Sequence, residues 1–251
     1  MKILTEAMLR SAALGEDTTE YCVDADVFVT PLAREYLRDR RISLVITEAR
    51  PAVMTRTPLP KQGEHTYIDA KTGAGYDEKP EHMTHLRSNI LVPKTHPRIG
   101  FRGQLDTLQA EIICIQARAQ EMGEEKLVKD LGDLLSSVRL ILGAEVKDEP
   151  LEPVKVLGLS EEELRSHSHH VKRYFGIDHP VPDYSMGVMA AELNRLRTKV
   201  REAELSAVHA FCAEDGTIER TDIIRQLNRL SSGVYIVFCR WLTGYYKGGR
   251  R

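Results

Sequence analysis

The stretch Asn194–Glu204, NRLRTKVREAE, lies in a run from Met186 to Cys212 that contains no proline and a single glycine, next to its start. A run of this length and composition predicts one helix. Its apolar residues recur at three- and four-residue steps, which places them along one face: Leu193, Leu196, Val200, Ala203, Ala207 and Ala210. At about 100° per residue, Arg197, Arg201 and Glu204 form a second face beside the apolar one. We therefore expect a buried seam flanked by two guanidinium groups and a carboxylate.

Two interpretations fit this polar strip. Guanidinium groups and a carboxylate stacked beside a buried seam suit a polyphosphate and its metal ion, because arginine binds phosphate oxygens in a planar, paired geometry. The strip also suits a solvated ladder of salt bridges, since Arg201 and Glu204 are an ordinary helix pair that contributes roughly a few tenths of a kcal/mol. The helix alone favours the ladder, and the neighbouring segments reverse that preference.

The bulk composition is that of an ordinary soluble protein. The chain has 251 residues, of which 42% are hydrophobic and 29% charged, enough for one sizeable domain plus a small one. Its net charge of −2 gives neither of the large fields that nucleic-acid or membrane-surface binding requires. The four cysteines form no CxxC pair, and two lie on helical apolar stripes, which favours buried thiols in a reducing compartment. Without a visible signal peptide or long apolar run, we expect a soluble, cytoplasmic protein.

Residues 1–60 predict a small α/β appendage. Leu4–Leu14, LTEAMLRSAAL, is typical of a short helix, and Thr30–Arg40 of a second one, with Thr30 as its N-cap and a proline at its first position. Ile42–Thr47 is rich in β-branched residues, as strands are. So few apolar residues indicate an appendage rather than a large independent domain.

The next part, from Arg50 to Pro97, carries prolines, glycines and polar residues without clear periodicity. Long loops of this kind in compact proteins are usually functional or disordered. Lys71–Gly75, KTGAG, could offer backbone N–H groups to a phosphate, although a plain turn accounts for the same residues. We expect residues 61–95 to be an irregular segment that contains a nucleotide-binding loop.

Beyond Pro97 the pattern is helical. A near-heptad spacing predicts one helix from Leu105, Leu108, Ile112, Ile115, Ala119 and Met122, and a second from Leu127, Leu131, Leu134, Val138 and Ile141. Ser160 and Glu163 form a capping box that begins a third helix, which runs to about Tyr174. The arginine-bearing helix is the fourth, and the fifth runs from about Asp222 to Trp241 with these residues inward: Ile223, Leu227, Leu230, Val234 and Val237. Mostly short connections favour antiparallel neighbours, so residues 96–245 predict an all-α, five-helix bundle.

Three motifs follow one another along this part of the chain. The first runs from Thr84 to Asp106 and reads THL, VPK, PR and LD in order. The second begins at Pro182 and ends in RTKVREAE, and the third is LNRLS at Leu227–Ser231. In residue type and spacing these motifs resemble the ATP:cobalamin adenosyltransferases. One such match is weak, whereas three in order are strong.

Longer segments resemble the ethanolamine-utilisation type of this family. They are Lys79–Leu86, His96–Glu111 and the N-terminal Leu4–Arg10 and Thr30–Arg41, the last two of which the propanediol-utilisation branch lacks. The similarity therefore covers nearly the whole chain. It implies a helical bundle of the cobalamin adenosyltransferase type with a small N-terminal appendage.

The resemblance implies transfer of the 5′-deoxyadenosyl group of ATP to cob(I)alamin. In that reaction cobalt attacks the 5′ carbon of ATP, a Co–C bond forms, and the triphosphate leaves. Fixed cations and Mg²⁺ would neutralise the leaving group. A dry pocket that excludes the lower axial ligand would make the reduced cobalt easier to reach. The product, adenosylcobalamin, would serve a cobalamin-dependent ammonia-lyase or diol dehydratase.

The resemblance also assigns roles to individual residues. Arg197 and Arg201 match phosphate-contacting arginines, and Asp106 matches an aspartate that pairs with the first of them across a subunit interface, so these three are the expected catalytic residues. Glu204 and Asn228 match the acid and the amide that hold ATP and its Mg²⁺, an ion that prefers oxygen ligands. Further expected ATP contacts are Thr84, Lys94 and Arg98. Two alternatives stay open: Asp106 as a solvated surface acid, and Arg98 as a mere helix-terminal charge.

The residues expected to contact the corrinoid differ from those of the relatives. The propanediol type places a phenylalanine three residues before the loop proline, where its ring excludes the axial base, whereas this chain has His179 before Pro182. Either His179 lies over the lower face of the cobalt, where an imidazole could itself coordinate the metal, or Phe175 or Ile177 takes the role. A loop histidine with no such duty is an equal alternative.

Two further departures concern the segment before Thr84. Relatives carry a TGDxG loop directly upstream, where this chain has YDEKPEHM, with KTGAG further back. Many ethanolamine-type members also have a histidine followed by a CCxxC cluster, whereas the region after His65 contains no cysteine. We predict no structural zinc or iron site, because no four-ligand spacing appears among the other candidates: His82, His85, His167, His169 and His170.

Two other functions compete with the enzyme. One is a binding module that carries adenosylcobalamin or docks to a microcompartment shell, and the other is a helical scaffold whose arginine face is an interface. Relatives of the bundle type are trimers with ATP between subunits, so we expect a homo-oligomer, with the trimer favoured. The expected partners are ATP, cobalamin, and a cobalamin-dependent lyase or microcompartment components, in the cytoplasm or within a microcompartment. Nucleic acid and membrane are not expected partners.

Overall fold

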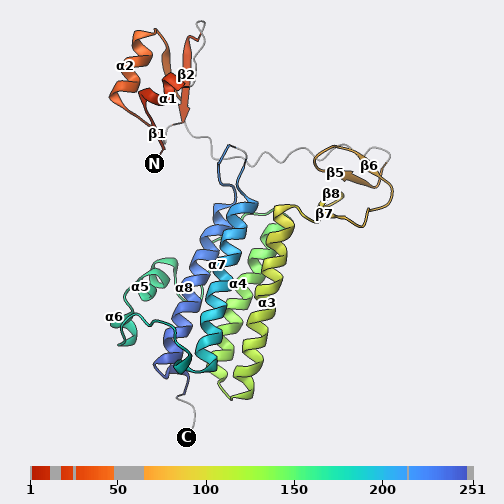
Figure 1. Cartoon of the computed structure of the whole chain (residues 1–251), viewed down its shortest axis with the longest axis vertical. Helices are drawn as coiled ribbons and strands as arrows, with labels where there is room; N and C mark the ends of the chain where they lie inside the picture. The colour runs from red at the N-terminus through yellow and green to blue at the C-terminus, as the bar shows by residue number, and fades with distance from the viewer. Residues whose placement is uncertain (1, 12–17, 25–26, 48–64, 214, 248–251) are drawn as a thin grey trace. The chain divides into compact units, whose positions relative to one another are not determined.

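A computed structural model describes residues 2–11, 18–24, 27–47, 65–213 and 215–247 of the chain. The chain divides into two compact units, residues 1–63 and residues 64–251 (Figure 1). Each unit has its own buried apolar cluster. Within the described ranges, no helix is long and apolar enough to cross a membrane.

The first unit is a small α/β arrangement. Its elements are, in order, β1 (Lys2–Leu4), α1 (Glu6–Ser11), β2 (Glu20–Asp24), β3 (Val27–Val29), α2 (Pro31–Asp39) and β4 (Ser43–Thr47). β1 pairs in parallel with β3, and β2 with β4. The predicted start of α2 is confirmed, because Thr30 Oγ1 accepts a hydrogen bond from the backbone N–H of Ala33 at 3.3 Å and Pro31 is the first helical residue. The expected appendage therefore has the mixed character predicted for it.

The second unit begins with a small sheet. Its strands are β5 (Tyr67–Asp69), β6 (Gly75–Tyr76), β7 (Met83–Arg87) and β8 (Ile90–Pro93), arranged in the order β6-β5-β8-β7. The prediction of an irregular segment is wrong for this described part of the chain. Strands of two to five residues are too short to show an alternating pattern, so they escape an analysis of periodicity.

The KTGAG sequence forms the turn between β5 and β6. Asp69 Oδ1 accepts hydrogen bonds from the backbone N–H groups of Lys71 at 2.7 Å and Thr72 at 2.9 Å, and Gly73 has a φ of +72°. The hydrogen bond from Thr72 is the main reason why the pKa of Asp69 lies below its usual value. Because the chain's own carboxylate occupies these N–H groups, the geometry favours the plain turn over a phosphate-binding loop.

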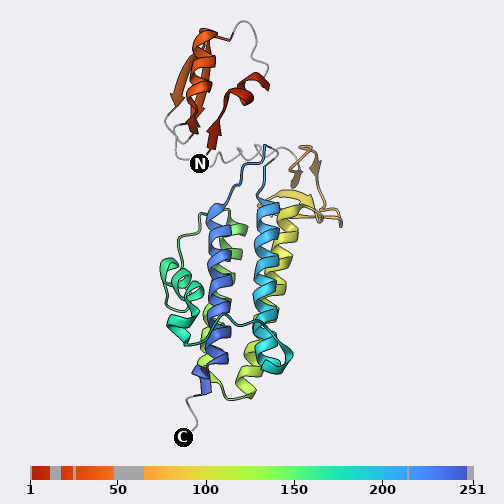
Figure 2. The same cartoon turned by 60° about the vertical axis from the view of Figure 1, so that its left-hand side comes forward.

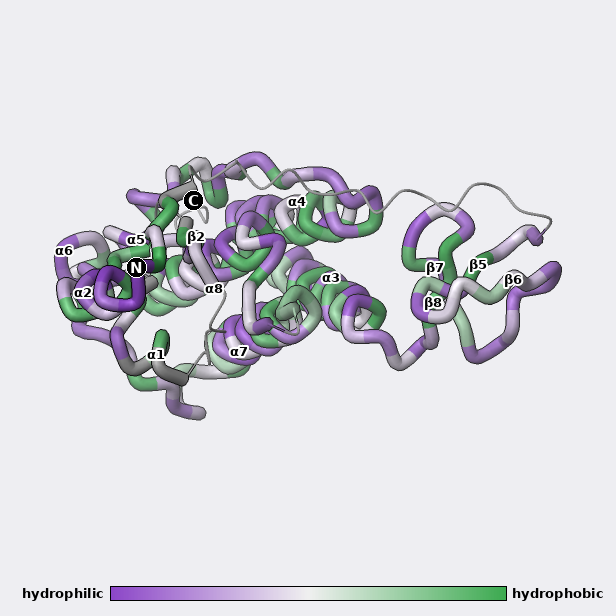
Figure 3. Tube along the Cα trace, turned by 90° about the horizontal axis from the view of Figure 1, so that it is seen from above, coloured by the Kyte–Doolittle hydropathy of each residue, from purple (hydrophilic) through white to green (hydrophobic). Residues whose placement is uncertain are grey.

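Four long helices of the described chain form a bundle. They are α3 (Pro97–Glu121), α4 (Glu125–Lys147), α7 (Val188–Ala210) and α8 (Thr221–Leu242). α3 packs against α4 and α7, and α8 packs against α7 and α4, so the four enclose one core (Figure 2). The mixture of hydrophobic and hydrophilic residues around these helices is visible from above (Figure 3).

The remaining predicted helix is not a bundle member. The segment that follows Ser160 forms two short helices, α5 (Glu161–His169) and α6 (Val171–Phe175), on the outer side of α8 (Figure 1). The predicted capping box is confirmed, but such a box marks where a helix begins and not how long it is. Leu164 and Val171 are the buried residues of α5 and α6, which is too little apolar surface for a place in the core. The all-α, five-helix prediction is thus corrected to a four-helix bundle with small sheets.

The apolar seams of the long helices are confirmed except at helix ends. Their residues are almost fully buried in one cluster. Met122 is 42% exposed and Ala210 is half-buried, because these two residues lie where α3 and α7 end. The expectation of buried thiols holds for Cys239, whereas the other three cysteines are exposed.

A buried ion cluster fixes the end of the bundle that adjoins the sheet. Glu145, near the end of α4, is fully buried, and its carboxylate accepts hydrogen bonds from Nε of Arg98 at 2.7 Å and from Nε of Arg102. Arg102 also donates to the backbone carbonyls of His85 at 3.1 Å and Leu86 at 2.7 Å. The cluster therefore ties the end of α4 both to the start of α3 and to β7.

Replacing Glu145 by glutamine should destabilise the helical unit, because two largely buried guanidinium groups lose the charge that they share. We expect the free energy of unfolding to fall by about 3 kcal/mol, as measured by urea denaturation followed by circular dichroism. The matched control is Glu152→Gln at an exposed carboxylate, which should change stability by less than about 0.5 kcal/mol. Equal stability of the two variants would contradict a structural role for Glu145.

Candidate functional site

The predicted arginine strip borders a cavity of about 470 Å³. Arg197 and Arg201 contribute from α7, and Ser231, Ser232 and Tyr235 contribute from α8. The loop with His179, Pro180 and Pro182 and the end of α5 complete the lining. The four-residue step between the two arginines places both on the same side of α7, so one bound molecule can reach both guanidinium groups.

The cavity is positively charged, because its lining contains two arginines and neither aspartate nor glutamate. Arg197 donates from its guanidinium to Asn194 Oδ1 at 3.3 Å, and its guanidinium carbon lies 6.0 Å from the centre of the Tyr235 ring. Arg201 is exposed and makes no hydrogen bond or ion pair with another described residue. Guanidinium groups without a carboxylate partner keep their donors available, so this cavity suits a polyanion.

The alternative of a salt-bridge ladder is not supported by the geometry of the described residues. Glu204 accepts a hydrogen bond from Nδ2 of Asn228 at 3.0 Å instead of pairing with Arg201. Arg229 in turn donates to Oδ1 of Asn228. The acid and the amide that the resemblance assigns to one ligand therefore meet across α7 and α8, while Arg201 stays available.

Tyr235 connects the cavity to the loop above it. Its hydroxyl oxygen lies 2.9 Å from Nδ1 of His179, and the planes of the two rings differ by only 13°. Burial raises the pKa of Tyr235 to about 12, so the phenol is neutral at physiological pH. The two nearly parallel rings and the two arginines line the same cavity.

Of the three expected corrinoid contacts, His179 lines the cavity. Phe175 packs against the helical core, and its ring meets that of His167 edge-on with centres 6.4 Å apart. Ile177 is half-buried and does not belong to the lining. Position therefore favours His179 over the two apolar alternatives.

Thr84 and Lys94 belong to the sheet and not to the cavity. Thr84 pairs with Val92 across β7 and β8, and Lys94 follows β8 with its ammonium nitrogen 3.7 Å from Oε2 of Glu81. Neither of them is part of the lining around Arg201. A single chain therefore does not bring the two sets of expected ATP contacts together.

Asp106 and Arg98 also lie away from the cavity, on α3. Asp106 is exposed, and within the described part of one chain it makes no ion pair with Arg197. Arg98 points toward the buried Glu145 and also donates to Oδ1 of Asp148 at 3.3 Å. These internal carboxylates explain why a cation stands in the first turn of α3, a position that the helix dipole disfavours.

The sequence motifs do not assign a role in the site to Tyr235, Ser231 or Ser232, which line the cavity. A polar pattern in the sequence could have indicated them. Along one face of α8, polar residues recur at helical spacing: Asn228, Ser231 or Ser232, and Tyr235. A tyrosine in an otherwise apolar helix is more often a packing residue, which hides its role. The contributions of Ser168 and His169 had no sequence signal, since only the packing of α5 on α8 brings them to the cavity.

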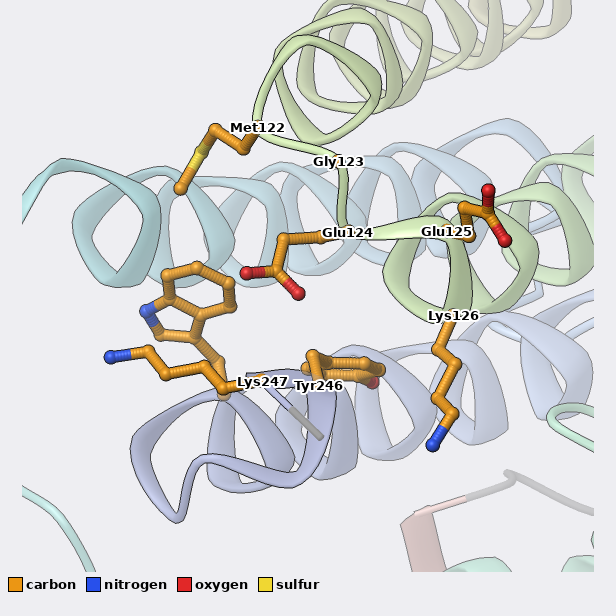
Figure 4. Close-up of a pocket in the computed structure, with 8 residues that line it drawn as sticks. Met122, Gly123, Glu124, Glu125, Lys126, Tyr246 and Lys247 are labelled. Atoms are coloured by element: carbon orange, nitrogen blue, oxygen red, sulfur yellow. The ribbon is translucent and has the colours of Figure 1, made fainter. Parts of the chain in front are cut away.

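A larger cavity, of about 630 Å³, lies between the α3–α4 turn and the end of α8 (Figure 4). Its walls include Glu124 and Glu125 together with Trp241 and Tyr246. The two carboxylates disfavour a polyphosphate there despite the nearby lysines. Size alone therefore does not identify the site, and the charge of the lining does.

The histidines are dispersed. His65 makes a hydrogen bond from its Nδ1 position to Asp77 Oδ1, 3.0 Å away, and His167 stacks on Tyr174 with ring centres 3.8 Å apart. Burial is the main reason why the pKa of His167 is lowered. Over the residues that the structure describes, no three His, Cys, Asp or Glu side chains gather in a way that could hold a metal ion. That the protein needs no structural zinc or iron site stays a prediction.

Fold and cavity together define a class of protein. A four-helix bundle that presents two arginines without carboxylate partners, the amide of Asn194 and a phenol in one acid-free cavity is suited to a polyanionic ligand. The neighbouring pair of Glu204 and Asn228 adds oxygen ligands of the kind that a phosphate-bound cation prefers.

Comparison with known proteins narrows this class. The family model described as cobalamin adenosyltransferase matches residues 76–241. The corrinoid adenosyltransferase EutT of Salmonella typhimurium is 36% identical over 245 residues, which are 93% of this chain and 90% of that protein. The EutT protein of Escherichia coli K12 is 35% identical over 244 residues, with the same shares. The chain belongs to the cobalamin adenosyltransferase family, and its resemblance to the ethanolamine-utilisation type is confirmed. No solved structure matches it.

Replacing Arg201 by alanine should weaken the binding of inorganic tripolyphosphate, because it removes the guanidinium that has no partner among the described residues. We expect the dissociation constant to rise at least about tenfold, as for the loss of one charge-assisted contact, in isothermal titration calorimetry. The matched control is Arg195→Ala, since Arg195 donates to Glu111 at 2.8 Å outside the cavity. Equal dissociation constants for the wild type and both variants would remove Arg201 from the site.

Proposed function

We propose that this chain transfers the 5′-deoxyadenosyl group of ATP to cob(I)alamin. The observation that carries the proposal is the acid-free cavity in which Arg197 and Arg201 face Tyr235 and the loop of His179. One wall suits a triphosphate, and the other offers aromatic, imidazole and proline surfaces that suit a corrin ring. Membership of the cobalamin adenosyltransferase family supports the same reaction.

The reaction requires a fixed cationic site for its leaving group. Cobalt attacks the 5′ carbon of the ribose, and the Co–C bond forms as the C5′–O bond breaks. The triphosphate takes the electron pair of the broken bond, so negative charge grows on its bridging oxygen. Arg197 and Arg201 stabilise that charge because they stand in place beforehand, Arg197 through Asn194 and the Tyr235 ring.

Glu204 and Asn228 would hold Mg²⁺ together with the phosphates. Nδ2 of Asn228 lies 3.0 Å from Oε1 of Glu204, and both side chains carry oxygen atoms, the ligands that Mg²⁺ prefers; Oδ1 of Asn228 would exchange its hydrogen bond from Arg229 for the ion. One carboxylate and one amide also fit an ion that takes few protein ligands and completes its shell with phosphate and water. When bound, the ion would neutralise charge on the triphosphate.

The complete site takes residues from two chains. Asp106 is exposed, and Arg197 has no carboxylate partner within its own described chain, so a second copy can supply one to the other. Thr84 and Lys94 likewise lie outside the cavity of their own chain. The contact joins two different surfaces, and such a contact closes into a ring when the rotation permits. This supports a closed ring of identical chains with ATP at each interface, and the resemblance to bundle-type relatives favours three chains in that ring.

The adenosylcobalamin made in this way would supply a cobalamin-dependent ammonia-lyase or diol dehydratase. The resemblance to the ethanolamine-utilisation type favours the former. The N-terminal appendage, residues 1–60, would serve in docking to that enzyme or to microcompartment components, because it has an apolar cluster of its own apart from the bundle. The site of action would then be the cytoplasm or a microcompartment.

A spectroscopic assay tests the proposed reaction against the two competing functions. Cob(II)alamin is reduced in the presence of the protein, MgATP is added, and a light-sensitive Co–C product is followed by absorbance. We expect product from the wild type and a rate at least about tenfold lower from Arg201→Ala, which loses a charge-assisted contact to the leaving group. Arg195→Ala should match the wild type. Corrinoid binding without product would favour a carrier, and no effect of nucleotide or corrinoid would favour a scaffold.

Mixing two inactive variants tests the shared site. Asp106→Ala and Arg201→Ala damage opposite sides of the same interface, so a mixed oligomer contains some interfaces with neither substitution. When equal amounts assemble at random, about one quarter of all interfaces carry neither substitution, because each of the two sides is unsubstituted about half of the time. After unfolding and joint refolding we expect about one quarter of wild-type adenosylation, against about one tenth or less for each variant alone. No recovery in verified mixed oligomers would place the site within one chain.

A further inference from the structure

His179 and Tyr235 form a hydrogen-bonded pair in the lining of the cavity that also contains Arg197 and Arg201. Nδ1 of His179 lies 2.9 Å from the hydroxyl oxygen of Tyr235, and the nearly parallel rings have centres 6.2 Å apart. At this distance one of the two atoms donates its hydrogen to the other. The direction of the donation decides what the imidazole is able to bind.

Cys239, a buried thiol one turn further along α8, is a second group toward which the phenol can donate. The imidazole, the phenol and the thiol can form hydrogen bonds in two arrangements, here called two orders of donation. In the first, Tyr235 donates to the imidazole; in the second, the imidazole donates to the phenol oxygen and the phenol donates to sulfur. An imidazole nitrogen is a good acceptor and a thiol sulfur is a weak one, so the first order is favoured.

The first order fixes the tautomer of the imidazole. A neutral imidazole that accepts a hydrogen bond at Nδ1 carries its own hydrogen on Nε2. The phenol of Tyr235 remains a donor because its burial raises its pKa to about 12.

We propose that Tyr235 is a positioning residue that holds His179 as the Nε2–H tautomer and so keeps its imidazole from ligating the corrin cobalt. The inference rests on the corrinoid placement in the proposed function. A metal ligand needs a free lone pair on nitrogen. Here the phenol occupies the lone pair of Nδ1, and Nε2 carries a hydrogen.

The consequence is a histidine that covers the lower face of the corrin without becoming an axial ligand. Cobalt with one axial ligand fewer is easier to reduce, because the reduced metal keeps its electrons in an orbital that such a ligand would destabilise. The same Nε2–H group remains a donor for a polar group of the bound substrates. An imidazole held in this way can cover the cobalt as the phenylalanine ring of the relatives does. A free imidazole could not, because it would coordinate the metal.

The tautomer can be measured without any substrate, by ¹⁵N NMR of the full chain labelled at histidine. A ring nitrogen that bears hydrogen and one that accepts a hydrogen bond resonate in well-separated regions. We expect Nδ1 of His179 among the acceptors and Nε2 among the protonated nitrogens, with both signals assigned by their loss in His179→Gln. Tyr235→Phe should move both signals toward values averaged between the tautomers.

The matched control is Tyr174→Phe, which removes another hydrogen-bonded phenol, 2.9 Å from Ser166, and leaves the cavity unchanged. It should leave the signals of His179 where they are. A protonated Nδ1 in the wild type, or signals that Tyr235→Phe does not move, would overturn the proposal whatever the substrates of the enzyme are.

The effect on cobalt is read by EPR of bound cob(II)inamide, a corrinoid that lacks a base of its own. A nitrogen ligand splits the cobalt lines through the nitrogen nuclear spin. We expect no nitrogen splitting in the wild type or in Tyr174→Phe. We expect splitting in Tyr235→Phe and its loss when His179→Phe is added. Splitting in the wild type that His179→Phe removes would overturn the proposal.

One further outcome separates this inference from the function on which it rests. If the NMR result is as expected but His179→Phe alters neither the spectrum of bound cob(II)inamide nor its KM, the corrinoid lies elsewhere. That result would reject the corrinoid placement and with it the role toward cobalt. A wrong tautomer in NMR together with an altered spectrum in His179→Phe would reject the positioning role and leave the placement intact.

Discussion

The charge of the buried Glu145 carboxylate must be compensated inside the second unit. This requirement constrains how the helices and the sheet of that unit are arranged. A charge inside a protein is tolerated only when opposite charge and hydrogen bonds surround it, and Arg98 and Arg102 supply both. The two arginines stand in the first turns of α3, and Arg102 also holds the backbone carbonyl of Leu86. One interaction therefore aligns the start of α3, the end of α4 and β7, and the apolar seams of the bundle close beneath it.

Arg197 and Arg201 of α7 differ from the arginines of the buried ion cluster, because neither has a carboxylate partner in the described part of the chain. Arg98 and Arg102 are matched by internal carboxylates, as is Arg220, which pairs with Asp222 at 3.0 Å. Arg197 and Arg201 face a cavity whose lining has no acid, although the chain as a whole carries a net charge of −2. Local placement, and not overall charge, thus creates the cationic site. An arginine that a fold leaves without a carboxylate keeps its hydrogen-bond donors for a ligand.

What could be predicted from the sequence depended on the range of the interaction involved. The long helices show a period near 3.6 over many turns, so their seams, such as Leu193–Ala207 on α7, could be read directly. The strands β5–β8 are too short to show a period, and the bond between Arg98 and Glu145 joins residues far apart in the sequence. Arg197 and Arg201 were found because motif and helix face agree. Tyr235 was not, because only the loop of His179 shows that its hydroxyl is used.

The exposed faces of α3 and α7 support a site shared between chains. Asp106 and Ile113 stand seven residues apart on α3, and Arg201 and Leu205 stand four apart on α7, so each helix presents a charged and an apolar side chain along one line. Leu205 is 71% exposed and Ile113 is 47% exposed, although both belong to helices with a full apolar seam on their inner side. The acid and the isoleucine lie two turns apart on α3, and the arginine and the leucine lie one turn apart on α7, so the two surfaces are of complementary chemical character. Two different surfaces that complement each other are what a ring of identical chains requires, and such a ring would bring Asp106 to the arginines.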